Sequence, residues 1–320
     1  MDFELSDDQL ALQQGIGALC AGRFDMASVR ALASAGGVEA ARWNELAETG
    51  VLALTLGPAA GGLGLGWADA VVVFEQLGRS LVPGPLVDSL AAASLVDGAA
   101  TGRSIVGLVR NRAEPVMIEY FDALDVVLVL DDDGVHRVDA AELATTPLTR
   151  PLDPLTPVHR VDELPPGELI AGPDVGAELL MTATALLSAY ELGVAAGATD
   201  LAVAYAKERQ QFGKPIGAFQ AVKHMCADMT SRVEVARAAV YTAGVVLDAP
   251  DAAVAARAVA VARLLTRQAA GANGVDCVQV HGGMGWTWEV DAHLYLKRAW
   301  ALGPRFESVD DLAERMAQYV

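Results

Sequence analysis

The segment from Glu208 to Gln220, ERQQFGKPIGAFQ, carries side chains that could bind an anion and a planar ring together. Arg209 presents a planar cation that pairs with phosphate through two parallel hydrogen bonds. Phe212 offers a flat apolar face, and Gln220 adds a polar amide. A helix expected to begin near Phe219 would bring free backbone N–H groups and the positive end of its dipole to the same place.

A simpler interpretation of this segment is a turn between two long helices. Gly213, Pro215 and Gly217 suffice to reverse the chain and require no ligand. On the chemistry of this segment alone, the turn is the favoured interpretation.

A second cluster lies in the segment 277–300, CVQVHGGMGWTWEVDAHLYLKRAW. Its glycines would end a helix and let backbone N–H groups approach a ligand closely, and its polar and aromatic side chains could contact the same ligand. The residues concerned are Gln279, His281, Gly282, Gly283, Gly285, Trp286 and Trp288. A helix end with both tryptophans packed in the core explains the pattern equally well.

The elements that must position these clusters are mainly helical. Helical patterns are predicted over residues 6–20, 39–50, 67–83 and 85–100, and again over 174–209, 219 onward, 251–279 and 308–319. Ser6 is the expected N-cap of the first helix. Short Val-, Ile- and Leu-rich runs separated by turn residues predict strands at 104–110, 115–121, 125–139 and 158–164, with a hairpin turning at Asp133-Gly134. The expected fold is mainly α with a small β domain, divided into residues 1–103, 104–173 and 174–320, the last part being an antiparallel helical bundle.

Composition excludes several classes of function. The chain has 320 residues and a formal net charge of −18, which disfavours binding to nucleic acid. Its three cysteines, Cys20, Cys226 and Cys277, have no metal-ligand or CxxC spacing, so buried thiols in a reducing cytoplasm and no metal site are expected. The acidic N-terminal segment does not have the pattern of a signal peptide, and charges interrupt the most apolar segment, so no membrane span is expected.

Taken together, the two clusters are more specific than either one. RQQFGKPIGAFQAVKH and QVHGGMGWTWEVDAHLYLKRA resemble the two C-terminal signatures of the flavin-dependent acyl-CoA dehydrogenases. MDFELSDDQLAL and the block LGPAAGGLGLGWADAVVVFEQLGRSLVPGPL are similar to the N-terminal helical domain of that family. The resemblance implies an N-terminal helical domain, a middle β domain and a C-terminal four-helix domain in a tetramer built from dimers. It assigns contacts with an FAD, held mainly by the neighbouring subunit, to Arg209, Phe212, Gln220, Gln279, Gly282 and Gly283.

The sequence departs from the family in the middle domain and at the catalytic base. The loop that normally covers the flavin ring and the thioester has no recognisable counterpart between Ser104 and Pro173. Counting from the second signature without gaps places the usual base at Phe306, with Glu307 beside it. The alternative position falls near Ala183, and Glu191 on the same expected helix is out of register. A charge at the start of the last helix, for Glu307, and a polar group inside the bundle, for Glu191, are the structural alternatives.

These departures predict a partner subunit rather than a complete enzyme. The chain resembles the shortened subunit of actinobacterial heterotetrameric (α2β2) acyl-CoA dehydrogenases of steroid catabolism. That resemblance implies FAD, a longer catalytic subunit, an acyl-CoA substrate and an acceptor like electron-transfer flavoprotein. Two alternatives remain: a self-sufficient homotetramer that uses Glu307 or Glu191 as its base, and a non-catalytic scaffold with the same fold.

Overall fold

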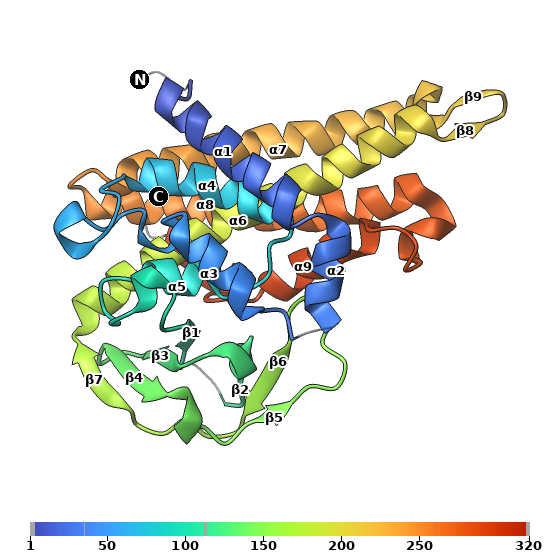
Figure 1. Ribbon diagram of the computed structural model, residues 1–320. Coiled ribbons are helices and arrows are strands. Elements are labelled where there is room, and N and C mark those ends of the chain that lie inside the picture. The colour runs from blue at the N-terminus through green and yellow to red at the C-terminus, as the bar shows by residue number, and fades with distance from the viewer. Residues whose placement is uncertain (1–3, 35, 112–113, 318–320) are drawn as a thin grey trace.

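The computed structural model describes residues 4–34, 36–111 and 114–317. Helices dominate both ends of the chain, and strands occupy its middle (Figure 1). The helices are α1 (Asp7–Arg23), α2 (Met26–Ser34), α3 (Ala40–Glu48), α4 (Trp67–Arg79), α5 (Leu86–Ala91), α6 (Pro173–Glu208), α7 (Gln220–Leu247), α8 (Ala252–His281), α9 (Ala292–Leu302) and α10 (Val309–Ala317). The strands are β1 (Val106–Arg110), β2 (Val116–Glu119), β3 (Val126–Leu130), β4 (Val135–Asp139), β5 (Thr146–Pro147), β6 (Val158–Val161), β7 (Glu168–Ala171), β8 (Gln210–Gln211) and β9 (Lys214–Pro215).

The expected fold class, mainly α with a small β domain, is confirmed. Helix α1 begins as its sequence predicts, because Ser6 and Gln9 form a reciprocal capping box. The predicted hairpin is also present: β3 pairs antiparallel with β4, and Gly134 in the turn has φ 141°.

One helical prediction needs correction, and two helices were missed. The helix expected over 85–100 ends at Ala91, because the chain then makes turns that bury Ala92, Ala93 and Val96 in the core. Helices α2 and α9 were not predicted, although both pack against neighbouring elements.

Strands β1 to β7 form two small sheets below the helices in Figure 1. One has the order β1-β3-β4-β7, with β1 and β3 parallel and the other pairs antiparallel. The other has the order β2-β6-β5 and is antiparallel throughout. Apolar side chains of β1, β2, β3, β4 and β6 form a core of their own between the sheets.

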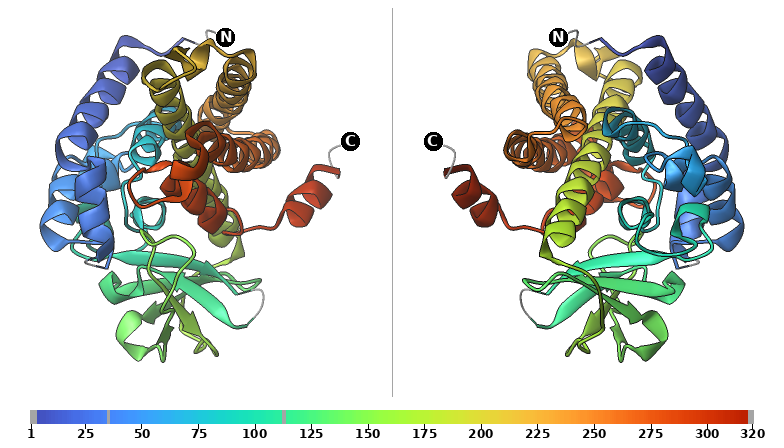
Figure 2. Two further views of the ribbon diagram at one scale, coloured as in Figure 1. Left: turned by 90° about the vertical axis from the view of Figure 1, so that its right-hand side faces the viewer. Right: turned by 90° about the vertical axis from the view of Figure 1, so that its left-hand side faces the viewer.

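Helices α6, α7 and α8 form a long bundle above the sheets, and α4 packs against α6 and α7. Glycines allow the close approach of α4 to α6: a Cβ on Gly78 would lie 1.9 Å from the carbonyl oxygen of Tyr190, and one on Gly193 would lie 2.0 Å from that of Glu75. Helix α10 extends to one side of the molecule (Figure 2) and contacts α8.

Helix α6 is long and apolar enough to cross a membrane, and no other helix in the described ranges meets that test. The most apolar window of α6 is 89% buried inside the protein, so packing within the core accounts for its composition. All three cysteines are free thiols. Cys20 and Cys277 are buried, as expected, whereas Cys226 is only half-buried.

Candidate functional site

The first predicted cluster forms a protruding hairpin at the end of α6. Strands β8 and β9 pair antiparallel, and the turn between them places Phe212 at φ 54° and Gly213 at φ 79°. Two consecutive left-handed residues define a type I′ turn, which matches the twist of a two-residue hairpin. Phe212 is 90% exposed, so this aromatic residue does not serve the core of the described chain.

The second predicted cluster forms the end of α8. Gly282 terminates the helix with φ 63°, and its N–H donates to the Gln279 carbonyl. A Cβ on Gly285 would lie 2.6 Å from the carbonyl oxygen of Val278, so Gly285 is needed for packing. Cβ atoms on Gly282 and Gly283 would meet nothing within 4 Å, so these two glycines face open space.

The structure brings the two clusters to the same end of the bundle. The imidazole of His281 stacks on the ring of Tyr205 with 4.2 Å between centroids, which joins the last turn of α8 to the last turn of α6. Helix α7 begins at the same end with Gln220. All six predicted contact residues are exposed there, and we call them the bundle-end surface: Arg209, Phe212, Gln220, Gln279, Gly282 and Gly283.

Trp286 and Trp288 follow this surface along the chain, and neither is packed as core. Trp286 is 55% exposed and Trp288 is 62% exposed. The interpretation of both tryptophans as core residues is therefore wrong.

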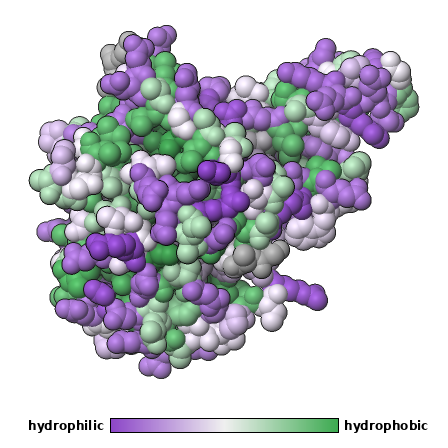
Figure 3. Space-filling model, in the orientation of Figure 1, coloured by the Kyte–Doolittle hydropathy of each residue, from purple (hydrophilic) through white to green (hydrophobic). Residues whose placement is uncertain are grey.

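The bundle-end surface is locally basic although the chain is acidic. The segment 207–224 contains the four cations Lys207, Arg209, Lys214 and Lys223 and one acidic residue, Glu208. Among the described residues Arg209 has no ion-pair partner, and no side chain caps the first turn of α7. Figure 3 shows mainly hydrophilic side chains over the end of the molecule that carries β8 and β9. A guanidinium, uncapped helix N–H groups and open glycine backbone suit a phosphate-bearing ligand.

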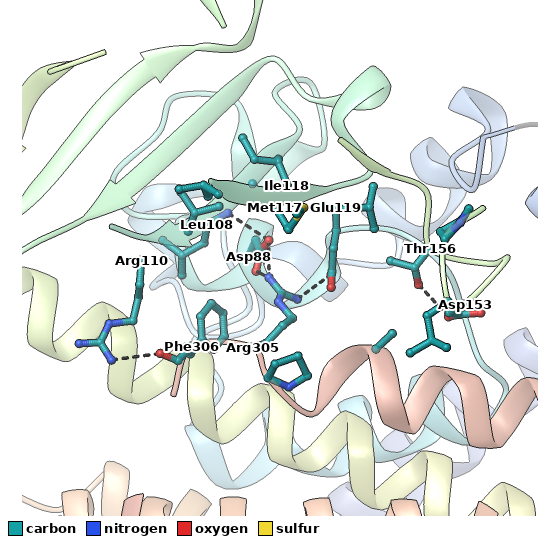
Figure 4. Close-up of a pocket in the computed structure, with 18 of the residues that line it drawn as sticks. Asp88, Leu108, Arg110, Met117, Ile118, Glu119, Asp153, Thr156, Arg305 and Phe306 are labelled. Carbon is teal, nitrogen blue, oxygen red and sulfur yellow. Dashed lines mark hydrogen bonds and ion pairs between the residues drawn. The ribbon is translucent and has the colours of Figure 1, made fainter. Parts of the chain in front are cut away.

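A cavity of about 550 Å³ lies on the other side of the molecule, between β1, β2, the segment 148–153 and the connection from α9 to α10 (Figure 4). We call it the strand-side pocket. Glu307 lines it, is buried, and lies 3.8 Å from the guanidinium of Arg110. Arg110 also donates to the carbonyl of Phe306, whose backbone has φ 64°.

Charged side chains that are buried or partly buried form the floor of the strand-side pocket. Arg305 donates to both carboxylate oxygens of Asp88, at 2.6 and 2.8 Å, and lies 3.3 Å from Glu119. Figure 4 shows its guanidinium between the two carboxylates. Burial raises the pKa of Asp88 and of Glu119 even though Arg305 opposes the shift. Beside them, Arg298 forms a buried ion pair with Asp153.

Glu191 does not lie in this pocket. Its carboxylate is fully buried and forms an ion pair with Arg263, and Thr266 also donates to it. Arg263 further donates to the carbonyls of Leu302 and Gly303, which fixes the start of the α9–α10 connection. Of the two sequence candidates for a base, only Glu307 lines a cavity with room for a substrate.

No three His, Cys, Asp or Glu side chains in the described ranges are grouped to hold a metal ion.

Comparisons with known proteins match this chain to one family. The model of the acyl-CoA dehydrogenase N-terminal domain matches residues 6–100, and that of the acyl-CoA dehydrogenase C-terminal domain matches residues 171–302. The chain is 34% identical to the acyl-CoA dehydrogenase IpdE2 of Mycobacterium tuberculosis over 98% of each chain. The chain belongs to the acyl-CoA dehydrogenase family.

Two solved structures share the fold at low sequence identity. The "Tcur3481-Tcur3483 steroid ACAD G363A variant" superposes with a TM-score of 0.85 at 22% identity and covers 98% of this chain and 97% of that one. The ChsE4-ChsE5 complex from Mycobacterium tuberculosis superposes with a TM-score of 0.83 at 22% identity and covers 99% and 98%.

Relatives in the acyl-CoA dehydrogenase family bind FAD. The bundle-end surface offers the donors and open backbone that a pyrophosphate needs. None of its six residues lines the strand-side pocket.

Sequence reasoning missed the charged floor of the pocket. Asp88, Glu119 and Arg305 come from α5, β2 and the α9–α10 connection, so no local spacing links them. One signal in the sequence could have indicated this cluster: Asp88 is a single charge inside the strongly apolar run PLVDSLAAA. A charge in such a run is expected to be buried, and a buried charge needs a partner of opposite charge.

Proposed function

We propose that this chain is a subunit of an FAD-dependent acyl-CoA dehydrogenase and completes the FAD site of a longer catalytic partner. The observation that carries the proposal is the bundle-end surface, where two open glycines and Arg209, which has no ion-pair partner among the described residues, face outward from the chain. Groups arranged in this way can serve a cofactor that another subunit holds from the opposite side.

The names of similar proteins support the assembly. One solved neighbour is a complex of two differently named chains, and another is called a steroid ACAD. We extend both features to this chain: an α2β2 heterotetramer that dehydrogenates a steroid-derived acyl-CoA between its α and β carbons. An acceptor like electron-transfer flavoprotein would then reoxidise the enzyme.

Five of the six residues of the bundle-end surface have a stated contact with the cofactor in this proposal. When bound, FAD supplies the acceptor for the β hydride. Arg209 would pair with phosphate oxygens, and Gln279 would hydrogen-bond near the adenosine end. Gly282 and Gly283 would let the backbone approach the pyrophosphate. Phe212 would cover a ring of the cofactor, and the α proton would be taken by a carboxylate of the partner.

The position of Glu307 favours one alternative, a self-sufficient enzyme that uses this residue as its base. A base must reach the proton that it removes, and Glu307 is the sequence candidate that lies in a cavity. Its neighbour Arg110 and the charged floor distinguish this cavity from a plain acyl pocket. A scaffold that has lost both flavin and chemistry is the remaining alternative.

The replacement Arg209→Ala tests the proposal in a complex co-expressed with the longer catalytic subunit that the proposal requires. Losing a charge-assisted hydrogen bond costs about 1.5–3 kcal/mol, so the dissociation constant for FAD should rise by roughly 10- to 150-fold. The matched control is Arg257→Ala, which removes an exposed arginine near the opposite end of α8 and should leave flavin binding unchanged. Equal flavin affinity in the two variants would contradict the assigned role of Arg209.

A further inference from the structure

The strand-side pocket has an apolar wall that the described chain leaves uncovered. Met117 is 47% exposed, Leu148 39% and Leu152 54%, and all three line this one cavity. On β2 the burial alternates, so Met117 and Glu119 share the face toward the pocket while Val116 and Ile118 face the core between the sheets. The strand therefore offers the cavity one apolar and one acidic side chain.

The charges of the pocket do not cancel. Asp153 is balanced by Arg298 and Glu307 lies beside Arg110. On the floor, however, the described residues provide one guanidinium, that of Arg305, between the carboxylates of Asp88 and Glu119. Asp311 adds a further carboxylate to the lining. Asp88 takes both of its short hydrogen bonds and also accepts from the backbone N–H of Leu108, at 3.1 Å. Glu119 is left with the longer 3.3 Å contact, so it is the less compensated of the two floor carboxylates.

This arrangement sets the chemistry of a ligand. A carboxylate or phosphate entering the cavity would meet surplus negative charge in a partly desolvated place, where repulsion is weakly screened. A hydrogen-bond donor would instead give Glu119 a partner that Arg305 does not fully supply. The walls would bury an apolar body, and a cavity of about 550 Å³ is in the range of small-molecule sites.

We propose that the strand-side pocket binds a small apolar molecule whose polar end is an uncharged or cationic hydrogen-bond donor, received by Glu119. The head group is a hydroxyl or an ammonium, and its donor proton faces the Glu119 carboxylate while the apolar body lies against Met117, Leu148 and Leu152. This goes beyond the proposed flavin role, because none of the residues of the bundle-end surface takes part.

Three probes with one tail and different heads test the proposal: octylamine, 1-octanol and octanoate. Calorimetric titration into the purified full chain at pH 7 and 150 mM salt should show octylammonium binding most tightly and octanol next. Octanoate should bind at least about ten-fold more weakly than octylammonium, because like charges repel. In Glu119→Gln the advantage of octylammonium over octanol should disappear. Octanoate binding as tightly as octylammonium would overturn the proposal.

A pair of tryptophan variants locates the binding. Met117→Trp should fill the cavity and abolish binding of octylammonium. Leu169→Trp, on β7 and 56% exposed, adds the same bulk outside this cavity and should leave it unchanged. If octylammonium still binds to Met117→Trp, its binding reflects a general attraction between an amine and an acidic protein. That result would contradict the proposal.

The two proposals fail separately. Met117→Trp should leave flavin content in the complex unchanged, and Arg209→Ala should leave octylammonium binding unchanged. If Met117→Trp instead prevents assembly with the longer subunit and none of the probes binds, the apolar wall is a protein interface and the ligand proposal is wrong.

Discussion

The bundle-end surface and the strand-side pocket differ in where their charged groups find partners. At the bundle end, Arg209 and the open glycines face outward, and the described chain provides no counter-charge for Arg209. In the pocket, Arg305, Asp88, Arg298 and Asp153 are ion-paired within the chain. Exposed groups without a partner inside the described chain, such as Arg209, indicate contact with another molecule. The ion pairs Arg305–Asp88 and Arg298–Asp153 instead serve the fold itself.

The largest expected effect comes from breaking a buried pair near the pocket. Arg263→Met leaves Glu191 buried without its cation and removes the donor to the carbonyls of Leu302 and Gly303. The free energy of unfolding should fall by about 3–5 kcal/mol, measured by urea denaturation. The control Arg79→Met breaks an exposed pair with Asp200 and should cost less than about 1 kcal/mol. Similar losses in both variants would remove the distinction between buried and exposed charges.

The second-largest expected effect is on flavin affinity at the bundle end, without a change in stability. Gly283→Ala adds a methyl group where nothing lies within 4 Å, so folding should be unaffected. The methyl group would stand between the backbone and the pyrophosphate, and flavin affinity in the complex should fall about ten-fold, or roughly 1.4 kcal/mol. Gly271→Ala, also in open space but within α8, is the control and should retain full flavin content. Full flavin content in Gly283→Ala would place the cofactor elsewhere.

A smaller effect is a pH-dependent change in the free energy of unfolding caused by Glu119 in the strand-side pocket. Burial raises the pKa of Glu119, so the folded chain holds this proton to higher pH than the unfolded chain does. The contribution of Glu119 to the free energy of unfolding is therefore fully present below the pKa that Glu119 has in the unfolded chain. It is lost as the pH rises through the pKa that Glu119 has in the folded chain. Glu119→Gln stays uncharged and should be about 1 kcal/mol more stable than the native chain at pH 7. Below about pH 4 the difference should vanish.

Urea denaturation of both proteins at pH 4 and pH 7 checks this prediction, with Glu168→Gln on the exposed edge strand β7 as the control. A loss of stability at pH 7 would show that the contact with Arg305 outweighs the cost of burying Glu119.

The smallest expected effect concerns Glu307. If the partner supplies the base, Glu307→Gln should change turnover of the complex by less than about two-fold, because general-base catalysis itself contributes about 10²–10⁴-fold. A steady-state assay with an acyl-CoA and an artificial electron acceptor measures this. A loss of two or more orders of magnitude would make Glu307 the base and favour the self-sufficient enzyme.

Local signals in the sequence were reliable where one interaction decides the structure. Ser6 capped α1 and Asp133-Gly134 marked the β3–β4 hairpin, because caps and turns depend on neighbouring residues. Helix α9 was missed because His293 and Arg298 interrupt its apolar face, and both are buried only through tertiary contacts. The family signatures identified the six residues of the bundle-end surface, and the structure places all six at one end of the bundle. Their contact with FAD stays a prediction.

The charged floor could not be predicted from sequence patterns. Asp88 and Arg305 are separated by 217 positions, and such a pair forms only when the folded chain buries both. Glu307 was identified by counting along the chain, and the structure adds its position in a cavity beside Arg110.

The most direct test of the account is the flavin absorbance at about 450 nm per chain, measured for this protein purified alone and for the complex with the longer dehydrogenase. A bundle-end surface that serves a neighbour's cofactor predicts no flavin in the lone chain and one flavin per pair of chains in the complex. One flavin per chain in the lone protein would contradict the account and place a complete FAD site, and the search for the base, within this chain.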